Sequence, residues 1–161
     1  MPAEATNESG TVLQGGRPKA YRPLPVSERR VAFEAGLAAY GRGDFFEAHE
    51  LLEPAWMGTA DPIERELVQG LIKLAAAYVH AVRGNPLGME KNLRGARARL
   101  ASAEDADPPA TPPGPAEAGA PTSSELDLPA LIGAIDARLA HLAGGGPAVI
   151  DPPDLPRRSA P

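Results

Sequence analysis

Three side chains of one short segment, His49, Glu50 and Glu53, have the types and spacing of metal ligands or of a general acid and base. An imidazole and a carboxylate four residues apart lie on the same face of an α-helix, where both can bind one divalent ion. With His80 as a third ligand, the set has two imidazoles and one carboxylate, which suits Zn or Fe. In this interpretation Glu50 is the general base of a metal-dependent hydrolase.

The segment also departs from the known metal-binding helix patterns. His49-Glu50-x-x-Glu53 lacks the second imidazole of the His-Glu-x-x-His motif of zinc proteases. It also reverses the Glu-x-x-His order of di-iron helical bundles. The hydrolase therefore remains the alternative interpretation, and the sequence predicts no cofactor unless a divalent metal binds to His49, Glu53 and His80.

A structural role explains the same residues. In an α-helix, Phe45, His49, Leu52 and Trp56 fall within about 60° of one another, which places His49 in an apolar stripe. Imidazole, carboxylate, indole N–H and amide groups can satisfy one another's hydrogen bonds between helices. The favoured interpretation is a non-catalytic interaction or binding module with a buried His/Glu network. The predicted polar cluster comprises His49, Glu50, Glu53, Trp56, Gln69, Lys73 and His80.

The second half of that cluster lies on the next expected helix. Gln69, Lys73 and His80 fall within about 40° of arc there. If their stripe faces the preceding helix, the cluster forms one polar pocket, which can be a structural network, a metal site or a groove for a partner or small ligand. If it faces outward, it is the hydrated side of an apolar helix, and the sequence leaves both possibilities open.

Apolar periodicity predicts five helices around these residues. The first runs from Ser27 to about residue 42, the second from Asp44 towards residue 56 and the third from Asp61 to about residue 83. The fourth follows residue 86, and the fifth follows residue 127 and ends at a Gly run from residue 144. Glu three residues after each Asp gives the second and third helices the spacing of a capping box. Pro54 predicts a kink or an early end of the second helix.

Proline and glycine define the expected domain organisation. The 161 residues include 19 Pro and 17 Gly, which are concentrated towards the ends of the chain. The sequence predicts an all-α fold: a compact antiparallel bundle of four to five helices with a disordered Pro/Gly-rich arm, linker and tail. The expected divisions are a flexible arm at 1–26, a bundle core at 27–102, a linker at 103–125, a C-terminal helix docking on the core at 126–143 and a flexible tail at 144–161.

Composition excludes several classes of protein and partner. The chain has no Cys, so it can form neither a disulfide framework nor a thiolate metal site. Residues 27–102 balance ten Lys and Arg with ten Asp and Glu, which argues against a nucleic-acid-binding face. The longest apolar stretch, 67–82, contains three polar residues and is too short to span a bilayer. We expect a cytoplasmic protein with no membrane or nucleic-acid partner.

The small size of the core suggests a partner. A domain of about 75 residues buries only about 60–65% of its unfolded surface and is marginally stable alone. We therefore expect a homodimer. No sequence pattern identifies a further protein or small-molecule partner.

The segment from Phe33 to Leu100 resembles the bacterial and archaeal family called domain of unknown function 309. The resemblance rests on Gly43-Asp44-Phe45-Phe46-Glu47-Ala48-His49-Glu50, Leu52-Glu53, Trp56, Gln69-Gly70-Leu71-Ile72, Ala75-Ala76-Ala77, His80 and Gly84-Asn85. It implies an all-α bundle and no established activity. Lys73 stands where the family would lead us to expect Gln, and Pro54 is unusual within the motif. A cation at position 73 would occupy space that a metal needs.

Overall fold

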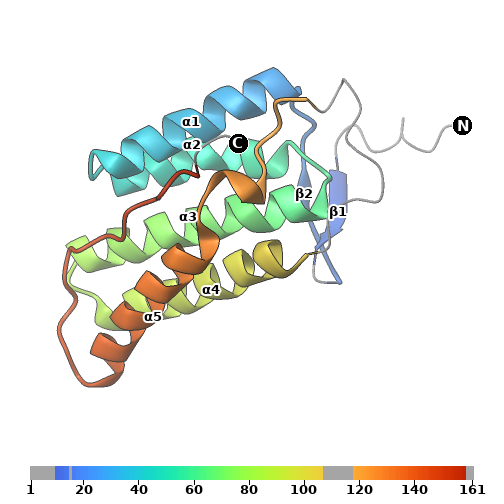
Figure 1. The fold of residues 1–161 in the computed structure, drawn as a ribbon. Helices are drawn as coiled ribbons and strands as arrows, with labels where there is room; N and C mark the ends of the chain where they lie inside the picture. Colours follow the sequence, from blue (N-terminus) through green and yellow to red (C-terminus); the bar gives the residue numbers. More distant parts are fainter. Residues whose placement is uncertain (1–9, 15, 107–117, 159–161) are drawn as a thin grey trace, which may run out of the picture.

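The computed structural model describes residues 10–14, 16–106 and 118–158. Within these residues, five α-helices pack against one another beside one small hairpin, which confirms the predicted all-α bundle (Figure 1). The helices are α1 (Val26–Gly41), α2 (Phe45–Met57), α3 (Pro62–Val82), α4 (Pro86–Asp105) and α5 (Leu128–Ala143). None of the helices in the described segments combines the length and apolarity needed to cross a membrane.

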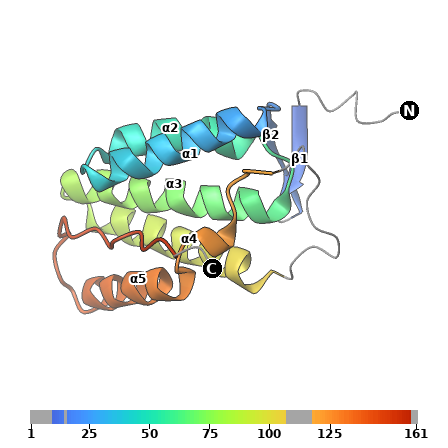
Figure 2. The same ribbon diagram turned by 45° about the horizontal axis from the view of Figure 1, so that its top comes forward.

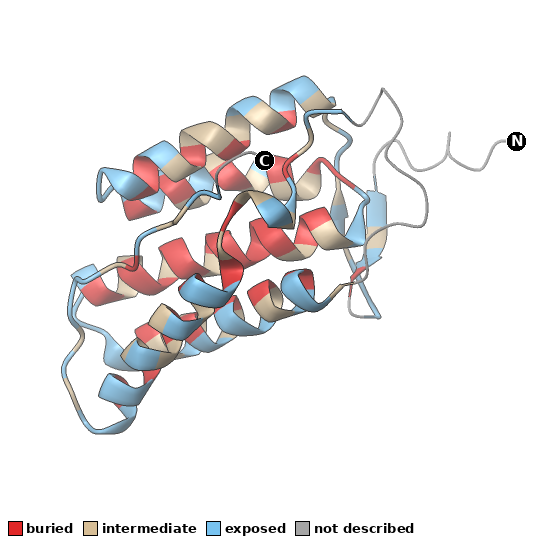
Figure 3. Cartoon of the chain, viewed as in Figure 1, coloured by how far each residue is buried: buried red, intermediate tan, exposed pale blue. Residues whose placement is uncertain are grey.

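Helix α3 forms the centre of the bundle. It packs against α2 on one side and α4 on the other, while α1 covers α2 and α5 packs against α4 (Figure 2). Because α3 is enclosed by neighbours, side chains around much of its circumference are buried, among them Leu67, Leu71, Leu74 and Tyr78 (Figure 3). This burial fits its nearly continuous apolar sequence.

The helix starts agree only partly with the predicted caps. The Asp61 carboxylate accepts a hydrogen bond from the backbone N–H of Ile63 at 3.0 Å, as an N-cap does. Asp44 makes no such bond; it pairs with Arg42 at 3.3 Å. Helix α2 also continues three residues beyond Pro54 to Met57, so the early end that this proline allowed does not occur.

Glycines of α4 allow long side chains of α3 to lie across it. A Cβ atom at Gly95 would stand 2.8 Å from the Cδ atom of Lys73. A Cβ atom at Gly88 would overlap the imidazole of His80. The missing side chains therefore create the space in which Lys73 and His80 lie between the two helices.

The N-terminal segment forms a hairpin where the sequence suggested a flexible arm. Strands β1 (Gly10–Gln14) and β2 (Arg17–Tyr21) are antiparallel. The chain after β2 is joined to the end of α2 by two backbone hydrogen bonds, Arg22 N–H to Met57 O at 2.9 Å and Leu24 N–H to Gly58 O at 3.0 Å. These long-range bonds have no signature in local sequence, which explains why periodicity did not predict the hairpin.

The C-terminal segment likewise departs from the expected flexible tail. After α5 the chain returns along the bundle, where Pro153 is buried and Leu155 packs against the core. A short 3₁₀ helix, η3 (Ser123–Glu125), lies in the expected linker. The parts of the predicted arm, linker and tail at 1–9, 107–117 and 159–161 lie outside the described residues.

Candidate functional site

A half-open pocket of about 190 Å³ lies where α2, α3 and α4 meet. Its lining comes from three helices and comprises His49, Glu53, Trp56, Gln69, Ile72, Lys73, Ala76 and Asn92. Five of the seven residues predicted from the sequence therefore surround one space. The 3.6-residue period of α2 and α3 directs these side chains to the facing sides of the two helices.

One wall of the pocket consists of imidazole and carboxylate groups. The Nδ1 atom of His49 lies 3.2 Å from Glu50 Oε1 and 3.8 Å from Glu53 Oε2. One ligand atom from each of the three residues lies within 4.8 Å of the others. These side chains are 31%, 55% and 40% exposed, so they are not the buried network that the sequence suggested. Ala76 of α3, whose side chain is small, also lines this space.

The other wall carries a cation. Lys73 lies over Gly95, and burial lowers the pKa of its ammonium group, assisted by the positive charges of Arg99, Lys19 and Lys91. Among the described residues no carboxylate lies within ion-pair distance of the Lys73 ammonium group. The pocket thus places an unpaired cation opposite a carboxylate.

His80 does not line this pocket. Its Nδ1 atom lies 3.2 Å from Asn85 Nδ2, and its ring lies over Gly88 at the start of α4. The amide oxygen of Asn85 accepts a hydrogen bond from the Gly88 N–H at 3.0 Å and thereby caps α4. The structure therefore brings His49 and Glu53 together without His80, and His80 supports the turn between α3 and α4.

Gln14 of the hairpin forms hydrogen bonds with two residues that line the pocket, Trp56 and Gln69. Its side-chain oxygen accepts hydrogen bonds from Trp56 Nε1 at 3.1 Å and from Arg65 Nε at 3.2 Å. Its amide nitrogen donates to Glu66 Oε1 at 2.6 Å and to Gln69 Oε1. Trp56 and Gln69 both line the pocket, so the hairpin helps to fix one end of it.

Arg65 extends this network beneath the hairpin. The residue is only 1% exposed, and its guanidinium group donates to three backbone carbonyls, at Trp56 (3.1 Å), Thr59 (2.9 Å) and Ala20 (3.1 Å). It also lies 4.8 Å from the centre of the Trp56 ring. With these three carbonyls and the Gln14 side chain as acceptors, the Arg65 guanidinium group joins β2, α2 and α3.

A buried ion pair, Arg29 with Glu64, lies next to this network. Arg29 Nε and Nη2 donate to the two carboxylate oxygens of Glu64 at 2.8 and 3.3 Å, and Thr59 Oγ1 donates to Glu64 at 3.1 Å. Burial raises the pKa of Glu64, and the hydrogen bonds from Arg29 and Thr59 oppose that rise. Glu64 therefore does not complete the capping box expected at the start of α3, because its carboxylate bonds across helices.

Sequence reasoning missed this buried network. Arg29 lies in register with Phe33, Gly36 and Tyr40, which are buried on α1, so its position on the apolar stripe was an available signal. Gln14 offered no comparable signal, because its partners lie more than 40 residues further along the chain.

Comparison with known proteins identifies one family. Residues 33–92 match the family model described as Domain of unknown function (DUF309). No curated protein and no solved structure matches the chain. The matched segment contains the pocket residues of α2 and α3, whereas the hairpin, α5 and the C-terminal segment lie outside it. Residues 33–92 therefore match the family model that their motifs suggested.

Proposed function

We propose that this protein is a non-catalytic binding module whose α2–α3–α4 pocket holds a small zwitterionic ligand such as an amino acid. The observation that carries this proposal is the pair of opposite charges on the pocket walls. Lys73 has no carboxylate partner among the described residues, and Glu53 faces the same space. A ligand with one anionic and one cationic group would satisfy both.

The dimensions of the pocket fit a ligand of this class. A volume of about 190 Å³ equals that of roughly six water molecules at about 30 Å³ each. The ligand carboxylate would bind to the Lys73 ammonium group, and the ligand ammonium group would bind to Glu53. Both contacts are charge-assisted hydrogen bonds, each contributing about 1.5–3 kcal/mol.

Tryptophan fluorescence provides a direct test, because Trp56 is the only tryptophan of the chain and lines the pocket. The full chain is titrated with each of the twenty amino acids while Trp56 emission is recorded. We expect at least one of them to bind with saturation. Lys73→Met keeps the side-chain stem over Gly95 and should weaken that binding about tenfold, which is about 1.4 kcal/mol.

A matched variant tests the other wall. Glu53→Gln keeps the shape of the side chain and should also weaken the amino acid about tenfold. Arg94→Gln, on the exposed side of α4, is the control and should leave the affinity unchanged. The proposal is wrong if no amino acid alters the emission, or if Lys73→Met binds the ligand as tightly as the original chain does.

A divalent-metal site is the second candidate, because His49, Glu50 and Glu53 offer ligand atoms within 4.8 Å of one another. In a metal-dependent hydrolase, Glu50 would be the base that activates a metal-bound water. Titration with ZnCl₂ or MnCl₂ distinguishes the candidates. Metal binding should be lost in His49→Ala and strengthened in Lys73→Met, since removal of a nearby cation favours a divalent ion.

We also propose self-association through the apolar surface of α2 and α3. Phe46 and Val82 are 63% and 60% exposed, and both line a shallow depression with Val79. Exposed apolar patches of this kind mark protein contacts. Light scattering after size exclusion should give a dimer for the original chain and a monomer for Phe46→Glu; a monomer in both cases would exclude this surface.

A further inference from the structure

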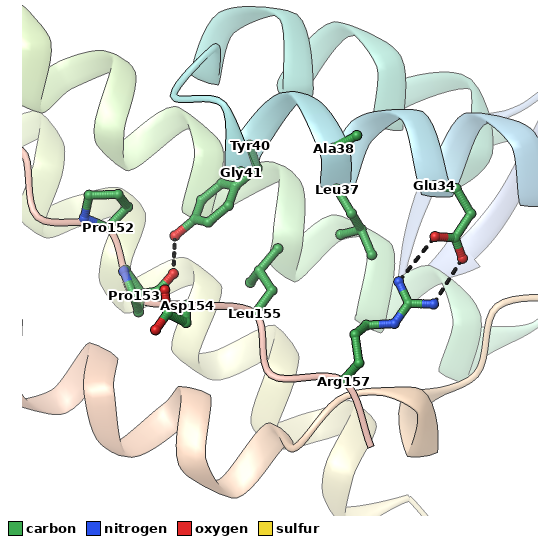
Figure 4. Close-up of a pocket in the computed structure, with 10 residues that line it drawn as sticks. All are labelled: Glu34, Leu37, Ala38, Tyr40, Gly41, Pro152, Pro153, Asp154, Leu155 and Arg157. Atoms are coloured by element: carbon green, nitrogen blue, oxygen red, sulfur yellow. Dashed lines mark hydrogen bonds and ion pairs between the residues drawn. The ribbon is translucent and has the colours of Figure 1, made fainter. Parts of the chain in front are cut away.

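The C-terminal segment lies in a groove beside α1 and α3 in the manner of a bound peptide (Figure 4). The Tyr40 hydroxyl donates to the carbonyl oxygen of Pro153 at 2.7 Å, and the Tyr78 hydroxyl donates to that of Asp151 at 2.9 Å. Burial raises the pKa of both tyrosines, so their hydroxyls remain protonated donors at neutral pH.

The sequence of this segment limits its conformations before it binds. Pro152, Pro153 and Pro156 each fix one φ angle, and the residue before each proline is confined to extended conformations. A chain that is already extended loses little conformational entropy on docking. Donors of an aromatic-lined groove that bind the carbonyls of such a chain are typical of domains that recognise proline-rich segments.

Arg157 follows the prolines and adds an ion pair to the contact between the segment and the groove. Arg157 donates to both carboxylate oxygens of Glu34, at 3.1 and 3.0 Å, and lies 3.5 Å from Glu125 Oε1. A bidentate guanidinium–carboxylate contact fixes both position and direction. Glu34 thus holds an arginine side chain at this distance after the prolines.

Backbone pairing completes the contact. The backbone N–H of Arg158 donates to Glu125 O, and the backbone N–H of Asp127 donates to Pro156 O, both at 2.8 Å. Arg157 and Leu126 form an antiparallel bridge there. Because these bonds involve main-chain atoms, another chain of similar sequence can make all of them.

The segment does not fill the groove. A cavity of about 400 Å³ remains between it and α1, bordered by Leu37, Tyr40 and Leu155. The segment is joined to α5 through Gly144-Gly145-Gly146 and residues 147–149. A short tether of this kind keeps the segment at an effective concentration on the order of millimolar.

We propose that this groove is a binding site for proline-rich segments followed by arginine, and that residues 150–158 of the chain occupy it until such a segment of a partner protein replaces them. The site is separate from the α2–α3–α4 pocket and does not depend on the ligand of that pocket. The recognised pattern is the one present here, Pro-Pro-Asp-Leu-Pro-Arg.

The test uses the full-length chain and a fluorescein-labelled synthetic peptide with the sequence of residues 147–158. Leu155→Asp combined with Arg157→Glu should release the tethered segment from the groove. Fluorescence anisotropy should then show peptide binding at least tenfold tighter than to the original chain. Tyr40→Phe in the released chain should weaken the peptide again about fivefold, because it removes the donor to the carbonyl corresponding to Pro153.

Two further measurements keep the result interpretable. Arg157→Ala alters only a half-exposed side chain, so it should remain folded and should show an intermediate gain in peptide affinity. A control peptide with Glu at the position of Arg157 should bind no chain. Equal peptide affinity for the original, Arg157→Ala and released chains, or no binding to any of them, would overturn the proposal.

Discussion

Two clusters of polar residues that both adjoin Trp56 differ in how far their hydrogen bonds are satisfied. In the network of Gln14, Arg29, Glu64 and Arg65, every side chain is nearly or fully buried and bonded to a fixed protein partner. In the pocket, His49, Glu53 and Lys73 are partly exposed, and among the described residues the Lys73 ammonium group has no carboxylate partner within ion-pair distance.

The comparison shows how position distinguishes structural from binding roles for similar residue types. A buried charge must be paired within the protein, because its desolvation is otherwise uncompensated. A half-exposed charge keeps part of its hydration and can exchange water for a ligand. Whether a polar side chain has all its hydrogen-bond partners within the protein is therefore a better guide to its role here than the presence of His and Glu in the sequence.

The strongest way to break this comparison is to remove one partner of the buried pair. Glu64→Ala removes the carboxylate that accepts two hydrogen bonds from Arg29 and should lower the free energy of unfolding by about 3–5 kcal/mol. Urea unfolding followed by circular dichroism measures the loss. A loss below about 1 kcal/mol would show that water already reaches this pair.

Gln14→Ala should have the next largest effect. It leaves Trp56 Nε1 and Arg65 Nε without an acceptor, which should cost about 1–3 kcal/mol. Trp56 emission should shift to longer wavelength as water replaces the amide. Thr11→Ala, at an exposed position of β1, is the matched control; if both variants lose the same stability, the effect comes from the strand and not from Gln14.

An exposed ion pair sharpens the comparison through its pH dependence. Arg157 lowers the pKa of Glu34 below its usual value of 4.5. The folded state therefore binds the Glu34 proton less tightly, so the stabilisation is complete above pH 4.5 and is lost as pH falls through the lowered value. Because both side chains are over 40% exposed, we expect the ion pair to contribute less than about 1 kcal/mol to the free energy of unfolding.

Unfolding of Glu34→Gln measures the combined contribution of Arg157 and of Arg30, whose Nη1 atom lies 2.6 Å from Glu34 Oε2. Its stability should fall below that of the original chain at neutral pH, and the two curves should converge in acid. A difference in stability between the two chains that persists in acid, where Glu34 is protonated, would come from packing.

The smallest effect is expected in the pocket. Glu53→Ala removes a side chain that is 40% exposed and 3.8 Å from its imidazole neighbour, so the free energy of unfolding should change by about 0.5 kcal/mol or less. Chemical unfolding measured beside Glu64→Ala makes the comparison direct. A loss as large as that of Glu64→Ala would assign Glu53 to the structural network.

Local sequence patterns predicted the helices well, because the period of buried residues and the Asp61 cap are properties of neighbouring residues. The same periodicity placed His49 and Glu53 on one stripe and Gln69 and Lys73 on another, but it left open whether the two stripes face each other, as they do around the pocket. It could not show how much of that space is filled, since the answer depends on what lies opposite each side chain.

The hairpin and the C-terminal segment could not be predicted in this way. Their composition is typical of chains without regular structure, and their order depends on single distant contacts such as Gln14 with Trp56 and Tyr40 with Pro153. The expected capping box at Glu64 failed for a related reason, because a tertiary partner, Arg29, binds its carboxylate more directly than the helix terminus does.

The absence of a side chain at Gly95 has a consequence for how this protein can vary. Alanine there would raise helix propensity by about 1 kcal/mol, so selection for a sturdier α4 favours it. Yet the added methyl group would meet the Lys73 stem at 2.8 Å and move its charge. If the pocket binds the proposed ligand, stability and ligand affinity can therefore change in opposite directions through a position that does not line the pocket, and substitutions limited to the lining residues would miss this effect.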